Sequence, residues 1–242
     1  MRYMLTYSYD GTNFNGYQKQ KGLRTVQGEI EKALKSINNK ATKIHSSGRT
    51  DAQVHANNQV GHVDIDVKIT EYKLKSALNS LLDDDIYIKD AKKVDDDFHA
   101  RYMVKKKEYV YKLNMGEFNP IERNYIFQYC NNLDVTAMKK AIKFFKGTHD
   151  FTSFSSNQDR KEDNVRTIYK ASINKEGTTL IFTFVGSGFL KYMVRIMVGA
   201  LIMVGKGKIS YKDINKIFDK KDKSLVKITA PGCGLYLNKI WY

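Results

Sequence analysis

The sequence has few of the residues that cross-link a chain or interrupt its regular structure. It contains two cysteines, Cys130 and Cys233, and no Cys-x-x-Cys pair. No disulfide framework beyond one bridge is therefore possible, and a reducing compartment such as the cytoplasm is expected. Two prolines leave no proline-rich linker to mark a domain boundary. The longest apolar segment, residues 189–205, is interrupted by Lys191 and Arg195, which predicts a buried helix and no membrane span.

Signatures of targeting and of cofactor chemistry are also missing. Residues 1–11 alternate polar and apolar side chains without an apolar core, so we expect no signal peptide. The segment GSGFLK, residues 186–191, lacks the spacing of a nucleotide-binding loop. No H-x-x-x-H or Cys/His ligand spacing occurs among the histidines, which stand at positions 45, 55, 62, 99 and 149. We therefore expect neither a metal nor a cofactor.

Positive charge is abundant and unevenly distributed. Residues 1–100 carry 15 Lys and Arg against 14 Asp and Glu, whereas residues 101–242 carry 26 against 12, for a total net charge of +15. Such an excess favours a polyanionic partner, with nucleic acid preferred over a solvated basic surface. A membrane surface is the weaker interpretation, because the lysines do not form one amphipathic stripe.

Hydrophobic periodicity predicts an α+β protein with two related halves. Alternating residues predict strands, a 3.6-residue period predicts helices, and Thr25 is an expected helix cap. In the first half the expected elements are a strand at 2–9, a helix at 25–37, strands at 41–47 and 59–67, a helix at 70–82 and a strand at 85–94. This β-α-β-β-α-β order is ferredoxin-like.

The second half predicts a larger version of the same plan. Its expected elements are a strand at 107–115, a helix at 135–145, a hairpin of 166–173 with 179–185, helices at 189–204 and 210–218, and a strand at 234–242. We predict domains at 1–100 and 101–242, with a central cleft between two sheets. The boundary rests on the element order and on the change in charge.

One loop, HSSGRTDAQVHA at residues 45–56, places Arg49 two residues before Asp51 among small side chains. One interpretation is a structural salt bridge. The other is a carboxylate that Arg49 keeps ionised, ready to act as a nucleophile or a base. Glycine and small hydroxyl residues would let a substrate backbone approach it closely.

This loop resembles a known catalytic loop. Residues 48–56 agree at eight of nine positions with the pattern G-R-T-D-A-G-V-H-A of the TruA family of tRNA pseudouridine synthases, and Gln53 stands where that family has glycine. Residues 9–20 resemble the family's YDG-x-x-F-x-G-W-Q segment, with Tyr17 in place of tryptophan. Further similar blocks follow in family order, at residues 25–34, 98–113, 186–205 and 230–237. Together they span essentially the whole chain.

The resemblance implies a pseudouridine-synthase fold, an activity and a set of site residues. Family members isomerise uridine to pseudouridine at positions 38, 39 or 40 of the tRNA anticodon stem-loop. They do so without metal or cofactor, as homodimers in which one tRNA reaches across both subunits. Asp51 would be the essential carboxylate, whether it attacks C1′, adds to the ring or removes the C2′ proton. Arg49 would orient Asp51 and keep it ionised.

Other matching residues would form the base pocket and the RNA surface. Tyr109 would stack on the target base near C5, Arg195 would pair with Asp51 or with phosphate, and Leu235 would pack against the base. The sequence pattern alone, without the resemblance, predicts Tyr109 and Leu235 as core residues. Arg195 differs, because an arginine inside an apolar helix needs a partner for its charge. Lys191 lies one turn before Arg195, and His55 orients the loop or caps a turn. The remaining candidates for phosphate or substrate contact are Arg24, Arg101 and the run that begins at Lys105.

Three alternatives stay open. The chain could be a related synthase that acts on another RNA such as ribosomal RNA, since Gln53 and Tyr17 depart from the family pattern. It could be a non-catalytic RNA-binding module with exposed aromatic residues on a sheet. A hydrolase with an aspartate nucleophile is the third, and it would act on a small molecule. A carboxylate at Asp51 argues against a pure binder, because it would repel phosphate.

Overall fold

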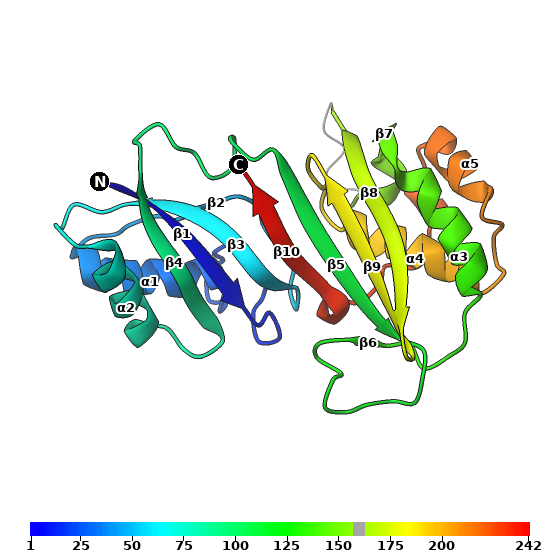
Figure 1. Ribbon diagram of the computed structural model, residues 1–242, viewed down its shortest axis with the longest axis horizontal. Helices are drawn as coiled ribbons and strands as arrows, with labels where there is room; N and C mark the ends of the chain where they lie inside the picture. The colour runs from blue at the N-terminus through cyan, green and yellow to red at the C-terminus, as the bar shows by residue number, and fades with distance from the viewer. Residues whose placement is uncertain (157–162) are drawn as a thin grey trace. The chain divides into compact units, whose positions relative to one another are not determined.

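The computed structural model describes residues 1–156 and 163–242, which form two compact α+β units (Figure 1). Unit 1 consists of Met1–Lys105 and Tyr236–Tyr242, and unit 2 of Lys106–Leu235. The sequence placed the boundary at residue 100 and assigned residues 236–242 to the second half. The structure instead places residues 236–242 in unit 1. The sequence could not show this, because the periodicity of a strand does not reveal which strands it pairs with.

Unit 1 is a mostly antiparallel sheet with two helices. Its elements are β1 (Arg2–Tyr9), α1 (Val26–Asn38), β2 (His45–Ser46), β3 (His55–Asp64), α2 (Glu71–Leu81), β4 (Ile86–Val94) and β10 (Leu235–Trp241). The strands lie in the order β4-β1-β3-β10, β2 pairs with β3, and β10 runs parallel to β3. The order β1-α1-β2-β3-α2-β4 along the chain is the one predicted from the periodicity.

Alternation and capping explain why these elements form. Tyr3, Leu5 and Tyr7 of β1 are at most 2% exposed, while the residues between them are half-buried, as a strand with one buried face requires. The Thr25 side chain accepts a hydrogen bond from the Gly28 amide at the start of α1. This confirms the predicted cap, since a hydroxyl at that position satisfies an amide that the helix leaves unpaired.

Unit 2 is built of mostly antiparallel strands and of helices. Its elements are β5 (Lys106–Asn114), β6 (Phe127–Gln128), α3 (Val135–Ala141), η1 (Ile142–Phe145), β7 (Gly147–Asp150), η2 (Thr152–Phe154), β8 (Val165–Glu176), β9 (Thr179–Gly186), α4 (Met193–Gly205), α5 (Asp213–Lys220), η4 (Lys223–Leu225) and η5 (Gly232–Gly234). The strands lie in the order β5-β9-β8-β7, and β6 pairs with β5. The predicted hairpin is β8–β9, with Gly177 at φ 58° in its turn.

Helix α4 begins later than the sequence predicted. The apolar run starts at Phe189, but the helix starts at Met193 after Tyr192, which has a left-handed φ of 63°. An apolar run alone carries no start signal, because residues 187–192 lack a side chain that caps the first turn. The helix predicted at 210–218 also begins later, because α5 starts at Asp213. The Ser210 amide donates to the Asp213 carboxylate at 2.8 Å.

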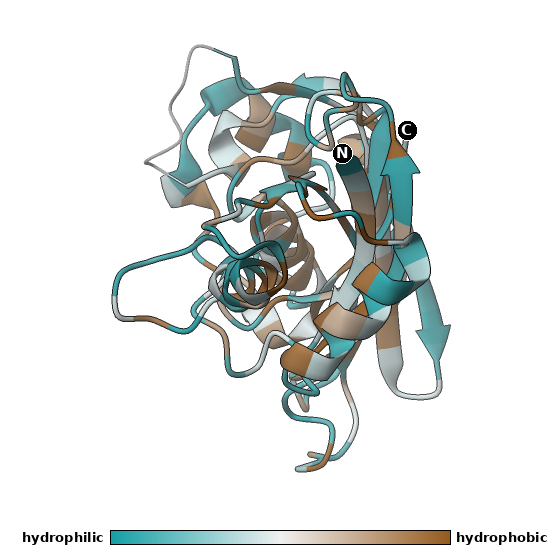
Figure 2. Cartoon of the chain, turned by 90° about the vertical axis from the view of Figure 1, so that its left-hand side faces the viewer, coloured by the Kyte–Doolittle hydropathy of each residue, from teal (hydrophilic) through white to brown (hydrophobic). Residues whose placement is uncertain are grey.

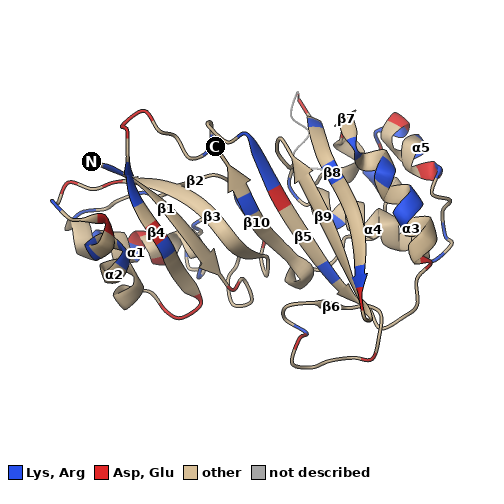
Figure 3. Ribbon diagram, viewed as in Figure 1, with Lys and Arg blue, Asp and Glu red and all other residues tan. Residues whose placement is uncertain are grey.

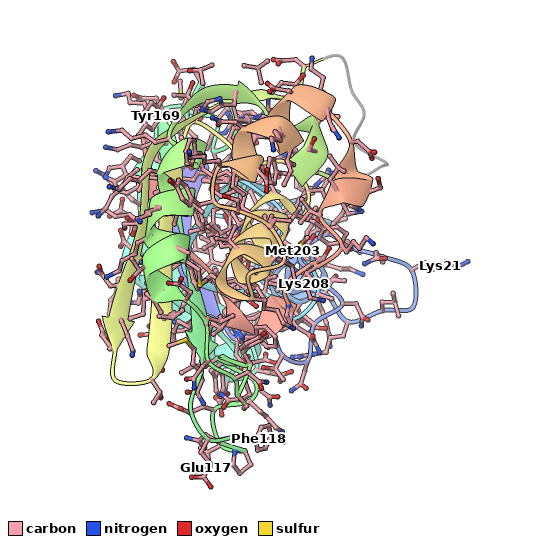
Figure 4. All side chains as sticks on the ribbon, turned by 90° about the vertical axis from the view of Figure 1, so that its right-hand side faces the viewer. Lys21, Glu117, Phe118, Tyr169, Met203 and Lys208 are labelled. Atoms are coloured by element: carbon pink, nitrogen blue, oxygen red, sulfur yellow. The ribbon has the colours of Figure 1, made fainter. Side chains whose placement is uncertain are left out.

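The surface follows the amphipathic pattern. In Figure 2 the helices and strands carry alternating brown and teal stretches, whereas the protruding loops are mostly teal or pale. Lys and Arg side chains are prominent on α3, β5 and β8 in Figure 3. Figure 4 shows Lys21 and Phe118 at the ends of loops. Across residues 1–156 and 163–242, no helix is both long and apolar enough to cross a bilayer.

Candidate active site

The loop that contains Asp51 connects β2 to β3 and is fixed at its first residues. The Ser47 amide donates to the Val60 carbonyl at 2.8 Å, and the Ser47 hydroxyl donates to Gln59 Oε1 at 2.7 Å. Gln59 is fully buried, and its Nε2 donates a hydrogen bond to the Gly48 carbonyl at 3.0 Å. The polar atoms at the start of the loop are thereby satisfied inside unit 1.

Asp51 is half-buried. Thr50, directly before it, is 8% exposed, and Val54, three residues after it, is 1% exposed. The Val54 amide donates to the Asp51 carbonyl at 3.2 Å, which closes a tight turn. Gln53 in this turn has φ 64°, the conformation expected of the glycine that the family pattern has there.

A second segment, residues 9–17, braces this loop. The Tyr9 and Thr50 hydroxyls are hydrogen-bonded at 2.8 Å, and the Tyr17 amide donates to the Thr50 carbonyl at 3.0 Å. Gly11 lies so close that a Cβ there would stand 2.2 Å from the Val54 carbonyl oxygen. The resemblance of residues 9–20 to a family segment thus corresponds to a physical contact with the loop.

Tyr17 replaces a tryptophan of the family pattern within the core of unit 1. Its side chain is 1% exposed and its hydroxyl is hydrogen-bonded to the Tyr7 hydroxyl at 2.7 Å. Burial raises the pKa of Tyr17 to about 12, so the phenol is neutral at ordinary pH. The hydrogen bond satisfies two buried hydroxyls.

Arg49 is exposed and stands two residues before the half-buried Asp51. An exposed ion pair gains little free energy against the entropy of two long side chains. The role of Arg49, which would orient Asp51 and keep it ionised, stays a prediction.

His55 is a buried element of the loop's support. It is 2% exposed, its Nδ1 accepts the Gly11 amide at 3.0 Å, and the Asp10 carboxylate lies 3.2 Å from the same nitrogen. Its ring stacks on Tyr236 of β10 with centroids 4.7 Å apart. The two predicted roles of His55, orienting the loop and contacting the substrate, stay predictions.

In unit 2, Arg195 lies in the first turn of α4 and is anchored by backbone. Its Nε donates to the Ala230 carbonyl at 2.7 Å, and the Ala230 amide donates to the Arg195 carbonyl at 3.1 Å. The guanidinium carbon lies 4.8 Å from the centre of the Tyr192 ring, a favourable cation–π distance. Lys191 is exposed, with Nζ 5.5 Å from the centre of the same ring.

Tyr109 and Leu235 line the edge of the unit 2 core. Tyr109 is 8% exposed and meets Phe189 edge to face at 4.9 Å, and Leu235 is 5% exposed. Sequence reasoning did not single out Phe189 or Tyr192. Both precede α4 and were counted as helical, so their aromatic contacts with Tyr109 and Arg195 were hidden by the wrong helix start.

Two titratable groups near Arg195 are held neutral. Burial raises the pKa of Tyr111 well above its usual value, and its hydroxyl donates to the Pro231 carbonyl at 2.9 Å. Burial also raises the pKa of the Cys233 thiol, with Arg195 partly offsetting the rise. At neutral pH these groups therefore contribute hydrogen bonding and packing, not charge.

Comparison with known proteins identifies the family. A family model described as tRNA pseudouridine synthase matches residues 5–103 and 141–242. The tRNA pseudouridine synthase A of Anoxybacillus flavithermus is 47% identical over 242 residues, covering 100% of this chain and 98% of that protein. The protein of the same name from an Exiguobacterium species is 46% identical over 241 residues, with the same coverage.

The chain belongs to the tRNA pseudouridine synthase family. It is accordingly an RNA pseudouridine synthase, an isomerase. The match to the family includes the Asp51 loop, the segment at residues 9–17 and the first turn of α4. The geometric features described above are therefore features of a synthase.

The phosphate candidates of this synthase differ in their surroundings. Arg24 donates to Asp85 at 2.6 and 2.9 Å and to Asp83 at 3.0 Å, and it stacks 4.3 Å above the Phe14 ring. A phosphate would have to compete with these pairs for its guanidinium. Arg101 and Lys105 are exposed, and in the described residues neither side chain takes part in an ion pair.

The synthase brings together three histidines that are distant in sequence. Ring nitrogens of His45, His62 and His99 lie within 4.8 Å of one another, which their spacing did not predict. His62 Nδ1 accepts the Ala100 amide at 3.1 Å, and His99 Nδ1 accepts the Arg101 amide at 3.2 Å. A neutral ring that accepts at Nδ1 carries its proton on Nε2. The backbone amides thereby set the tautomers of His62 and His99.

Proposed function

We propose that this synthase converts uridine to pseudouridine in tRNA, at positions 38, 39 or 40 of the anticodon stem-loop, with Asp51 as its essential carboxylate. The observation that carries the proposal is the half-buried Asp51, held in a braced loop. The relatives that match the full chain are named tRNA pseudouridine synthase A. The positions within tRNA rest on the resemblance of the loop to the TruA pattern.

The reaction rearranges bonds within one nucleotide. The N1–C1′ bond breaks, the base rotates, C5 bonds to C1′, the C5 proton leaves and N1 gains a proton. Atoms and electrons balance without a co-reactant. An ionised Asp51 has the chemistry for a nucleophile towards C1′ or the ring, or for a base towards C2′.

The unit 2 residues have properties that suit the same reaction. Tyr109 offers an aromatic face at the edge of a core, suited to stacking on a base near C5. Arg195 keeps a fixed direction through its bond to Ala230, as a partner for a carboxylate or a phosphate must. Leu235 adds apolar surface for the base, and Lys191 an exposed cation.

The RNA must also be held while the nucleotide leaves its stack. Extruding a base costs a few kcal/mol, which phosphate contacts and stacking offset. Arg101 and Lys105 are the exposed cations that we propose for these contacts, whereas Arg24 and His55 act within the protein. We also propose that the synthase is a cytoplasmic homodimer that needs no metal. Its two units would be ferredoxin-like halves, a proposal supported by the element order of unit 1.

The test uses unmodified tRNA transcripts without added metal, followed by mapping of pseudouridine at nucleotide resolution. Wild type is expected to form pseudouridine at positions 38 to 40, and Asp51→Asn to form none while it still binds RNA. Asp66→Asn, an exposed carboxylate variant in unit 1, is the matched control and is expected to retain activity. An active Asp51→Asn enzyme would remove Asp51 from the chemistry.

The other outcomes discriminate among the alternatives. Wild type that modifies ribosomal RNA and leaves tRNA unchanged would identify a synthase with another target. Binding of tRNA without modification of any cellular RNA would favour a binding module. Hydrolysis of a small molecule without dependence on folded RNA would favour a hydrolase.

A further inference from the structure

We propose that Tyr9 is a positioning residue for Asp51, which it orients through a hydrogen bond to Thr50. The inference rests on the proposed role of Asp51. Tyr9 is the last residue of β1 and is 4% exposed. Its hydroxyl lies 2.8 Å from the hydroxyl of Thr50, the residue directly before Asp51.

Thr50 is hydrogen-bonded at two points. A change at Tyr9 would therefore shift Thr50 and, with it, the adjoining backbone of Asp51. Its hydroxyl meets Tyr9, while its carbonyl accepts the Tyr17 amide at 3.0 Å. On the other side, the Asp51 carbonyl accepts the Val54 amide at 3.2 Å. The backbone of Asp51 is thus fixed from both sides.

The tyrosines of β1 distinguish this role from ordinary packing. Tyr3, Tyr7 and Tyr9 share one buried face, yet their hydroxyls reach different partners. Tyr3 donates to the Ile69 carbonyl at 2.6 Å, before α2, and Tyr7 bonds to Tyr17 at 2.7 Å. The hydroxyl of Tyr9 is the one that reaches the loop of Asp51. Tyr3→Phe is therefore a matched control, because it removes a tyrosine hydroxyl from the same strand without affecting the bond to Thr50.

Loss of the Tyr9 hydroxyl would leave the buried Thr50 hydroxyl without this partner. An unsatisfied buried hydroxyl favours a shifted loop, and small displacements of a reacting group have large effects on rate. The effect should fall on the chemical step and spare RNA affinity, because neither hydroxyl lies on an exposed surface.

The experiment measures single-turnover tritium release from tRNA labelled at C5 of uridine, together with RNA affinity and thermal stability. Tyr9→Phe is expected to lower the rate about tenfold, with RNA affinity within about twofold of wild type. Tyr3→Phe should keep the wild-type rate even where its melting temperature falls. Thr50→Val should reproduce Tyr9→Phe, Thr50→Ser should restore most of the rate, and the double variant Tyr9→Phe/Thr50→Val should be no slower than either single variant.

A wild-type rate in Tyr9→Phe, or an equal loss in Tyr3→Phe, would overturn the inference. Amide hydrogen exchange of residues 50–54 supplies a readout that is independent of activity. Exchange should increase in Tyr9→Phe and remain unchanged in Tyr3→Phe. If wild type makes no pseudouridine, the proposed function fails. Unchanged amide exchange in Tyr9→Phe would separately refute the proposal that Tyr9 positions the loop of Asp51.

Discussion

Gln53 shows how a single residue departs from what its backbone prefers. Its φ of 64° lies in the left-handed region, where a side chain costs about 1–2 kcal/mol. The side chain is exposed, so few contacts offset this cost. The sequence predicted the conflict, because the family pattern has glycine at this position.

Replacing Gln53 with glycine is expected to raise the free energy of unfolding by about 0.5–1 kcal/mol. The relief of the left-handed strain is partly offset by the greater freedom of glycine in the unfolded chain. Urea titrations of wild type, Gln53→Gly and Gln53→Ala would measure it, with the alanine variant expected near wild type. A glycine variant less stable than wild type would show that the side chain stabilises the turn.

His62 makes stability depend on pH at the residue scale. Burial, and then the nearby charges of Arg2, His45 and His99, lower its pKa from 6.5 to about 4, with Asp64 opposing. The unfolded chain therefore binds a proton that the folded chain does not bind between about pH 6.5 and 4. Its stabilising contribution is complete above the unfolded pKa and is lost as the pH falls through this window.

The expected result is a free energy of unfolding that decreases on acidification from pH 6.5 to 4, by up to about 1.4 kcal/mol per pH unit for this proton. The lowered pKa of His99 acts in the same direction. Denaturant titrations of His62→Gln should show a shallower dependence, since glutamine can accept the Ala100 amide without a charge.

At the scale of the element, local sequence signals predicted most helices and strands. They did not predict which other elements each one contacts. The cap Thr25 was predicted from residue type, and its side chain accepts the expected amide hydrogen bond. The start of α4 was missed because a left-handed Tyr192 leaves no mark in an apolar run. The sheet that receives β10 was missed because pairing depends on contacts far apart in sequence.

Gly199 of α4 allows the segment before β10 to lie against the helix. A Cβ at this position would stand 1.9 Å from the Ile228 carbonyl oxygen, and Ala230 two residues later binds Arg195. Gly199→Ala should therefore lower the free energy of unfolding by roughly 1–3 kcal/mol, despite the higher helix propensity of alanine, and reduce pseudouridine formation. Thermal denaturation and tritium release would measure both. Ser36→Ala, at an exposed position of α1, should leave both nearly unchanged.

At the scale of the whole molecule, charge separates the two units. Unit 2 carries 23 Lys and Arg against 12 Asp and Glu, whereas unit 1 carries 18 against 14. Composition predicted a polyanionic partner, but it did not reveal which cations are already engaged. Arg24 and Lys40 hold carboxylates, whereas Arg101 and Lys105 are exposed without an ion pair in the described chain.

Binding of tRNA should weaken with salt, and exposed cations should account for the slope. Neutralising Arg101 or Lys105 is expected to reduce the slope of log affinity against log salt by about 0.7–0.9 each if each contacts one phosphate. Lys216→Ala removes the same charge from a side chain paired with Asp213 at 2.7 Å, and should leave the slope unchanged. An equal change of the slope in all three variants would indicate that the net positive charge of the protein, and not contacts of Arg101 or Lys105 with single phosphates, determines the salt dependence.

The geometry of the candidate site could be predicted only in part. The motif predicts Asp51 as the catalytic carboxylate, and the position of glycine in the pattern matches the left-handed φ of Gln53. The pairing of Arg49 with Asp51 stays a prediction, because spacing along the chain does not fix side-chain contacts. The link from Tyr9 to Thr50 spans 41 residues, and the histidine cluster joins three segments. Such contacts depend on the fold and have no local signal.

The assignment of β10 to unit 1 has a consequence for synthesis on the ribosome. The Trp241 carbonyl accepts the Lys105 amide at 2.9 Å, and the Tyr242 hydroxyl donates to the Ala100 carbonyl at 2.7 Å. Tyr236 covers His55 beside the loop of Asp51. Unit 1 emerges first, yet it cannot complete its sheet until residues 236–242 have been translated. A nascent chain that stalls within unit 2 would therefore carry the loop of Asp51 without its final support until elongation resumed.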